Sequence, residues 1–150
     1  MAPSCDRLRF EMKRWDNGGA TLYAYDGRKR VGTSGTRTTD GVYGKHDIAV
    51  VGTMHVEPGY RRCGIATRMY QMLQRESCKH QRRLSSDASR TVASEKFWKK
   101  QFKKKRARCI RKGGIAKKLA PDMMPAGTWP CHHYEMKEAC PREFDLGRRR

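Results

Sequence analysis

Acidic residues are scarce in this chain of 150 residues: 15 Asp and Glu stand against 34 Lys and Arg, for a net charge of +19. This excess favours polyanionic partners, such as nucleic acid, an acidic protein surface or a phosphorylated cofactor. The sequence also has no apolar run near the roughly 20 residues that span a bilayer, and no charged and then apolar leader opens it. We therefore expect no membrane partner.

Closely spaced cysteine pairs are absent too. The six cysteines, at positions 5, 63, 78, 109, 131 and 140, form no CxxC motif. Two of them, Cys63 and Cys78, fall in a predicted helix, where buried thiols are ordinary. We therefore expect reduced thiols in a cytoplasmic protein.

The length suits one domain over residues 1–150, and 37% hydrophobic content with well-patterned apolar positions predicts a folded chain. Alternating apolar and polar residues predict strands in the first third of the chain. Tight turns, such as the one at 16–19, separate them. The predicted strands are 8–15, 20–25, 30–38 and 47–56, arranged as an antiparallel meander.

The pattern changes after Pro58, where a strand turns into an amphipathic helix predicted over 63–81. The first N–H groups of a helix lack partners within it and point back into the preceding turn. Gly64 would let an anion approach them closely, and the helix dipole adds to the attraction. The turn therefore predicts a phosphate-binding site.

The second half of the chain reads as a short strand, a helix, a basic segment and a last strand. The short strand, 83–86, is expected to lie parallel to the fourth strand because a helix crosses between them. Ser89 or Thr91 can cap the next helix, which carries Phe97 and Trp98. In the basic segment, 99–118, eleven of twenty residues are Lys or Arg and none is acidic. The last strand is predicted at about 129–137.

The stretch from Val56 to Ala66 resembles the coenzyme A loop of the GCN5-related N-acetyltransferase (GNAT) superfamily. Its signature is Gln or Arg, two residues, Gly, one residue, then Gly or Ala, and Arg61, Gly64 and Ala66 occupy those places. The resemblance covers roughly 47–105, the cofactor core. It implies an α/β (α+β) fold with a mixed, mostly antiparallel central sheet of about six to seven strands and helices packed on it.

The resemblance also implies acetyl-CoA as cofactor and direct transfer of its acetyl group to a primary amine. The loop N–H groups would hold the pyrophosphate, and the pantetheine arm would lie between the splayed fourth and fifth strands. An N–H of the strand would polarise the thioester carbonyl. The implied cofactor contacts are Met54, His55, Val56, Arg61, Arg62, Cys63, Gly64, Ile65, Ala66, Thr67, Ser86, Phe97 and Trp98.

Two catalytic positions depart from the family pattern. Many relatives carry a proton-donating tyrosine in the second helix, and Trp98 holds the nearest matching place. Relatives with a general base often carry it on the fourth strand, where this chain has Val50. Substitutes for the base are His46, Asp47, His55, Glu57, Asp87 and Tyr134. The alternatives are a base acting through water and an amine that arrives already neutral.

The turn at 16–19 leaves no room for the helices that usually separate the first two strands and wall the acceptor site. An open acceptor side indicates a large acceptor. A protein lysine or N-terminal amine is the first hypothesis, and aminoacyl-tRNA is the second. A third is a non-catalytic protein of this fold that binds coenzyme A or nucleic acid.

Three features also have ordinary structural explanations. Phe97 and Trp98 can both be core residues, or one can line the cofactor channel. The basic segment can be a solvated face, or it can contact nucleic acid or an acidic protein, with affinity that falls with salt. Cys131, His132, His133 and Cys140 match no common zinc spacing, so we predict no metal site.

Overall fold

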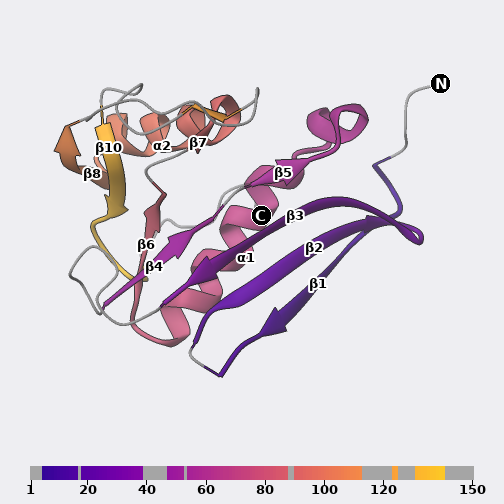
Figure 1. The fold of residues 1–150 in the computed structure, drawn as a ribbon, viewed down its shortest axis with the longest axis horizontal. Helices are drawn as coiled ribbons and strands as arrows, with labels where there is room; N and C mark the ends of the chain where they lie inside the picture. The colour runs from indigo at the N-terminus through magenta and orange to yellow at the C-terminus, as the bar shows by residue number, and fades with distance from the viewer. Residues whose placement is uncertain are drawn as a thin grey trace, which may run out of the picture.

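The computed structural model describes residues 5–16, 18–38, 47–52, 54–87, 90–112, 123–124 and 131–140. Its main sheet runs in the order β1-β2-β3-β4-β6-β10-β8, with β5 paired to β3, and β7 pairs with β9. This mixed, mostly antiparallel sheet confirms the predicted fold class (Figure 1). The strands are β1 Leu8–Arg14, β2 Ala20–Asp26, β3 Lys29–Arg37, β4 Ile48–Val51, β5 His55–Val56, β6 Arg83–Ser86, β7 Arg90–Thr91, β8 Ala107–Lys112, β9 Met123–Met124 and β10 Cys131–Met136.

The first three strands form the expected meander, and a turn joins β1 to β2 without a helix. In the turn, the Trp15 N–H donates to the Gly19 carbonyl at 2.9 Å, and Gly18 adopts a positive φ of 91° that suits glycine. The two strands then pair from Leu8↔Asp26 to Arg14↔Ala20. The described residues between β1 and β2 therefore form a turn, without the helices that the resemblance places between these strands.

The strand predicted over 47–56 is interrupted. β4 pairs antiparallel with β3 and parallel with β6, and the last pair of that parallel ladder is Val51↔Ser86. β5 pairs with β3 alone among the described strands. The sheet consequently opens between β5 and the chain that follows β6 (Figure 1).

A 3-10 helix, η1 (Pro58–Cys63), and the α-helix α1 (Ile65–Lys79) replace the single helix predicted over 63–81. Gly64 joins them with φ 70°, a left-handed conformation that glycine adopts without strain. Ile65, Met69 and Leu73 of α1 are fully buried in the core. Their helical spacing fixes which face of α1 packs on the sheet.

The second predicted helix is α2 (Val92–Lys103), and Thr91 caps it: its hydroxyl accepts from the Ser94 N–H at 3.1 Å. The basic segment then continues as β8, a strand that the sequence did not predict. β8 pairs antiparallel with β10, so pairing partners decide its structure more than its composition does. Residues 113–118 of the segment, with the predicted helix break, lie outside the described residues.

The expectation of reduced thiols is wrong. Three disulfides join Cys5 to Cys63, Cys78 to Cys140 and Cys109 to Cys131, with Cα separations of 5.6, 5.1 and 5.8 Å. The fold brings together cysteines 58, 62 and 22 residues apart, which spacing alone could not reveal. Disulfides persist in oxidising environments, so these three bonds do not support a cytoplasmic location, which stays a prediction.

In the part of the chain that is described, no helix is long and apolar enough to cross a membrane. The described elements share one hydrophobic core, built around Leu22, Val31, Leu73, Leu84 and Trp98. The single domain over 1–150 stays a prediction.

Glu76, near the end of α1, ties this helix to the first strand. Its carboxylate accepts from the Arg14 Nε at 3.0 Å and from the Lys79 Nζ at 3.4 Å, and its side chain is 8% exposed. Burial would raise the pKa of this carboxyl, but the hydrogen bond and charge of Arg14, with Lys79, outweigh burial and lower the pKa below its ordinary value.

Replacing Glu76 by glutamine should therefore reduce the free energy of unfolding by about 1 kcal/mol at pH 7. A lowered pKa contributes stability above the ordinary value near 4.5, and that stability is lost as the pH falls through the folded-state pKa. Urea unfolding at pH 7 and at pH 3 measures the change, which should be smaller at pH 3 because the pH has then fallen toward the folded-state pKa. Glu11→Gln, at an exposed carboxylate paired with Arg9, is the control and should have little effect at either pH. An undiminished difference at pH 3 would show that the carboxylate charge is not the cause.

Candidate functional site

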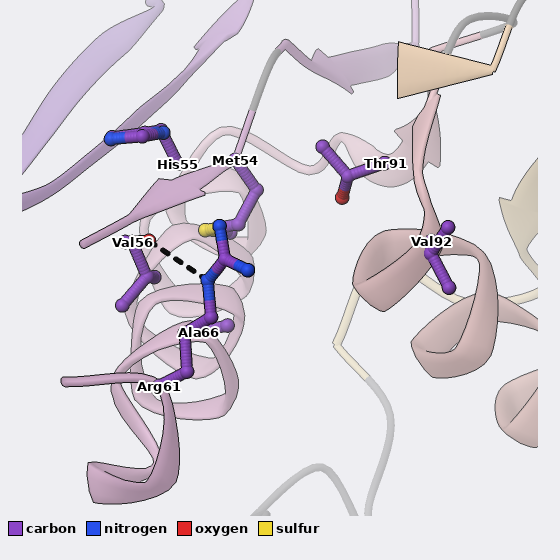
Figure 2. Close-up of a pocket in the computed structure, with 7 residues that line it drawn as sticks. All are labelled: Met54, His55, Val56, Arg61, Ala66, Thr91 and Val92. Atoms are coloured by element: carbon purple, nitrogen blue, oxygen red, sulfur yellow. Dashed lines mark hydrogen bonds between the residues drawn. The ribbon is translucent and has the colours of Figure 1, made fainter. Parts of the chain in front are cut away.

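The opening of the sheet forms a gap of about 260 Å³. One side comes from β5 and the start of α1, and the other from the residues where β7 passes into α2 (Figure 2). In Figure 2, Met54 and Arg61 face Thr91 and Val92 across the gap. The lining residues are Met54, His55, Val56, Arg61, Ala66, Thr91 and Val92.

The start of α1 faces this gap. The first helical bond runs from the Arg68 N–H to the Gly64 carbonyl at 3.1 Å, so the N–H groups before Arg68 are those that a helix leaves unpaired within itself. No described side chain caps this helix start. A Cβ built on Gly64 would meet no atom within 4 Å, so the space above the turn is open. The helix start can therefore accept an anion.

Two arginines precede this turn. The Arg61 Nε donates to the Val56 carbonyl at 3.2 Å, which holds the side chain along the end of β5 and its guanidinium at the gap (Figure 2). Arg62 is exposed. Both arginines lie in the last turn of η1, where they add positive charge beside the helix start. The electrostatics of the site thus favour a phosphate group.

Among the other predicted loop residues, Ala66 lines the gap and Thr67 lines the neighbouring hollow. The side chains of Cys63 and Ile65 are engaged elsewhere, the first in a disulfide to Cys5 and the second in the core. These two residues can therefore contribute backbone groups only.

A second hollow, of about 300 Å³, continues from the gap between α1 and α2 and shares Met54 and Ala66 with it. Phe97 lies on its wall, stacked on Tyr70 with ring centroids 3.8 Å apart. The Tyr70 hydroxyl is 2.6 Å from the Ser94 hydroxyl. Burial raises the pKa of Tyr70 to about 12, so it stays protonated at neutral pH.

Trp98, Ser86 and Tyr134 line none of the hollows described here. Trp98 is fully buried and belongs to the core, whereas the adjacent Phe97 lines the second hollow. The Ser86 hydroxyl accepts from the Tyr134 N–H at 2.8 Å. The Tyr134 hydroxyl donates to Glu95 at 3.3 Å, and burial together with the Glu95 charge raises the Tyr134 pKa to about 12.

A buried ion pair organises this region. Arg90 and Glu95 are 2.7 Å apart, with side chains 1% and 4% exposed. Arg90 also donates to the carbonyls of Asp87 and Cys131, each at 2.7 Å. The pair joins the start of α2 to β10 and so fixes the wall of the gap that carries Thr91. Glu95 and Tyr134 are thus held within this buried cluster and do not line the gap.

His55 and Glu57, the other candidates for a base, pair with each other. His55 Nε2 lies 3.3 Å from Glu57 Oε2, and the side chains are 44% and 43% exposed. In Figure 2 the His55 ring points away from Met54 and Arg61, so His55 borders the gap mainly through its backbone.

The remaining candidates are placed as follows. Asp47 pairs with Arg83 at 2.8 Å and Asp87 with Arg37 at 3.2 Å, while His46 lies outside the described residues. Cys131 and Cys140 are bound in separate disulfides and cannot serve as the zinc ligands considered above. Among the residues that the structure describes, no group of three His, Cys, Asp or Glu is arranged to hold a metal.

Several lining residues were not expected from the sequence, namely Thr91, Val92, Tyr70, Ser94, Lys96, Lys100 and Gln101. Thr91 was recognised only as a cap. The helical spacing of Lys96, Lys100 and Phe97 was the available signal, because residues three or four apart share a helix face.

A sheet that opens beside an uncapped helix start, with a hollow continuing between two helices, defines an α/β protein with room for a long ligand that carries an anionic group. Comparison with known proteins makes this specific. The model of the acetyltransferase (GNAT) family matches residues 2–102, and the chain belongs to this family. The search of curated proteins found no match.

Solved structures agree in fold. A GNAT acetyltransferase from Staphylococcus aureus has a TM-score of 0.52 and 16% identity, over 82% of this chain and 70% of its own. An N-acetyltransferase from the same species has a TM-score of 0.54 and 8% sequence identity, over 89% of this chain and 99% of its own. A GNAT acetyltransferase from Elizabethkingia anophelis was solved with acetyl-CoA bound. It has a TM-score of 0.51 and 10% sequence identity, over 87% of this chain and 95% of its own. At such identities the likeness concerns the fold.

Proposed function

We propose that this GNAT-family acetyltransferase transfers the acetyl group of acetyl-CoA directly to a primary amine on a macromolecule, first of all a protein lysine or N-terminus. Family membership supports acetyl-CoA dependence. The observation that carries the assignment is the uncapped start of α1, with open space above Gly64, at the end of the gap between β5 and β7.

The described residues fit this cofactor. The N–H groups at the start of α1, with Arg61 and Arg62, would hold the pyrophosphate. The backbone of Met54, His55 and Val56 would bind the pantetheine arm along the gap, beside Ala66. Bound there, acetyl-CoA supplies an activated acetyl thioester. Thr67 and Phe97 border the hollow that remains for its nucleotide end.

Catalysis would rest on positioning. The amine nitrogen would attack the thioester carbonyl, and its bond to carbon would form as the carbon–sulfur bond breaks. The proton that the amine loses would end on the leaving thiolate, through water, to give the free coenzyme A thiol. No described carboxylate lines the gap, and His55 is turned away from it. Holding amine and thioester in contact can itself supply several kcal/mol of the barrier reduction, roughly 7–11 in favourable cases.

The proposal of a macromolecular acceptor rests on the open front of the sheet. A shallow groove of about 270 Å³ runs across β2 and β3 to Gly52, directly after β4. Its lining is rich in hydroxyl groups and includes Arg37; the residues are Ala20, Thr21, Thr33, Ser34, Gly35, Thr36, Arg37 and Gly52. A segment of an acceptor chain could lie in this groove and extend its amine toward the gap.

The net charge of +19 favours a second candidate, acetylation of aminoacyl-tRNA. Lys104 and Lys105, between α2 and β8, and Arg108, in β8, are exposed and lie within the basic segment 99–118. Incubating the protein with labelled acetyl-CoA and a cell extract, followed by separate mass spectrometry of protein and RNA fractions, distinguishes the two acceptors. Label on protein amines supports the first proposal, and label on the aminoacyl group of tRNA replaces it with the second.

Acetyl-CoA should raise the melting temperature. At a concentration one hundred times the dissociation constant, binding stabilises the folded state by about 2.7 kcal/mol, which corresponds to a shift of roughly 5–10 °C. Thermal melting with and without acetyl-CoA measures the shift. Release of free coenzyme A thiol, on adding the acceptor that the labelling experiment identifies, then measures turnover.

Two outcomes would contradict the proposal. An unchanged melting temperature at millimolar acetyl-CoA would show that the protein does not bind this cofactor. A shift without any thiol release, for every acceptor fraction tested, would identify a non-catalytic protein that binds coenzyme A.

A further inference from the structure

Four lysines form one face of α2. Lys96, Lys99, Lys100 and Lys103 follow the spacing i, i+3, i+4, i+7, which places side chains next to one another along a helix. All four are exposed, and together they line a hollow of about 310 Å³. We call these four residues the α2 lysine face.

This arrangement costs stability. Like charges three or four residues apart on a helix repel each other, by about 0.2–0.5 kcal/mol per pair. In the described part of the chain no carboxylate forms an ion pair with any of the four lysines. The repulsion would be relieved by a bound anion.

The α2 lysine face adjoins the second hollow, which continues from the gap where acetyl-CoA is proposed to bind. Lys96 and Lys100 also line the hollow between α1 and α2, beside Phe97 and Thr67. That hollow in turn shares Met54 and Ala66 with the gap at β5. The three spaces are therefore consecutive, and the lysine face lies at the end away from β5.

We propose that the α2 lysine face binds the 3′-phosphate on the ribose of coenzyme A, with Lys96 and Lys100 as the principal contacts. This inference rests on the proposed function. Coenzyme A carries a diphosphate and, on its ribose, a separate phosphomonoester that is mostly dianionic at neutral pH. The start of α1 suits the first anion, and the lysine face suits the second because an ammonium group attracts a phosphate as a point charge.

The shape of the site favours this small ligand over a nucleic-acid strand. The lysines adjoin a bounded hollow with one half-buried aromatic ring, Phe97, on its wall. A single-strand binding surface would instead present successive aromatic residues for stacking along a groove. The described hollow suits one nucleotide.

The test compares acetyl-CoA with its 3′-dephospho form by calorimetric titration. The wild-type protein should bind the dephospho form about tenfold more weakly, a typical effect of losing one charge-assisted contact. Lys96→Gln combined with Lys100→Gln should weaken acetyl-CoA binding by about the same factor and leave binding of the dephospho form unchanged. The variant would then no longer distinguish the two ligands.

A charge-matched control separates a local contact from general attraction. Lys13→Gln combined with Lys137→Gln removes the same charge at exposed sites on β1 and after β10, and it should keep the tenfold preference. Equal affinity of the wild-type protein for the two ligands would overturn the inference while the proposed function stands. Failure of both ligands to bind would instead overturn the proposed function. A double variant that weakens both ligands equally would also exclude a contact to the 3′-phosphate.

Discussion

Replacing Gly64 by asparagine is expected to weaken acetyl-CoA binding about 100-fold while the free energy of unfolding changes little. Asparagine tolerates the left-handed conformation that Gly64 adopts at φ 70°. Its side chain would project into the open space above the helix start, where the pyrophosphate is proposed to bind. Losing two hydrogen bonds to a charged group costs about 3 kcal/mol, or about two factors of ten in affinity.

The matched control is Gly27→Asn. Gly27 has a similar φ of 63° in the turn between β2 and β3, and an added Cβ there would meet only the tip of the flexible Arg7 side chain. The Gly27→Asn variant should change the free energy of unfolding about as much as Gly64→Asn does, and it should leave the affinity for acetyl-CoA unchanged. Calorimetric titration and urea unfolding measure the two quantities. If Gly64→Asn binds acetyl-CoA as the wild type does, the phosphate site is not at this turn.

Local patterns predicted most of the elements that build this site. Alternation over residues 8–38 gave the meander, and the proline, arginine and glycine residues after β5 marked the turn into α1. These signals are local, because hydrophobic period and turn chemistry act over a few residues. The parallel pairing of β4 and β6 also followed, since a helix crosses between them.

Long-range packing accounts for what the sequence did not reveal. The interruption between β4 and β5 depends on strand pairing over long range. β4 pairs with both β3 and β6, whereas β5 pairs with β3 and not with β6. Tyr134 looked available for catalysis, yet the fold buries it against Glu95 and Trp98. β8 has a basic composition that resembles a solvated surface, and only its pairing with β10 makes it a strand.

The α2 lysine face is a different case, because its spacing was visible in the sequence. The basic segment 99–118 contains Lys99, Lys100 and Lys103 but not Lys96, so the segment taken alone hides the helix face that the four lysines share, with Phe97 at its edge. Their relation to the cofactor needed the structure, since the hollow that they line is built jointly with α1. Charge counted by segment thus carries less information than charge counted by face.

Removing either of the two disulfides that hold α1 should destabilise the protein by about 3 kcal/mol, which lowers the melting temperature by roughly 10 °C. The two close loops of nearly equal size, with sequence separations of 58 for Cys5–Cys63 and 62 for Cys78–Cys140. The entropy that each removes from the unfolded chain is therefore nearly the same. Thermal melting of the two double Cys→Ser variants checks this equality.

The two variants should differ in acetyl-CoA affinity. Cys63 directly precedes Gly64, so the first disulfide ties the proposed phosphate-binding turn to the N-terminal segment, whereas Cys78 lies at the far end of the helix. Loss of Cys5–Cys63 frees the turn and should reduce affinity several-fold, while loss of Cys78–Cys140 should leave it unchanged. Titration of the native protein with a thiol reagent should detect no free cysteine. Six reactive thiols, or equal affinities of the two variants, would show that the Cys5–Cys63 disulfide does not hold the turn.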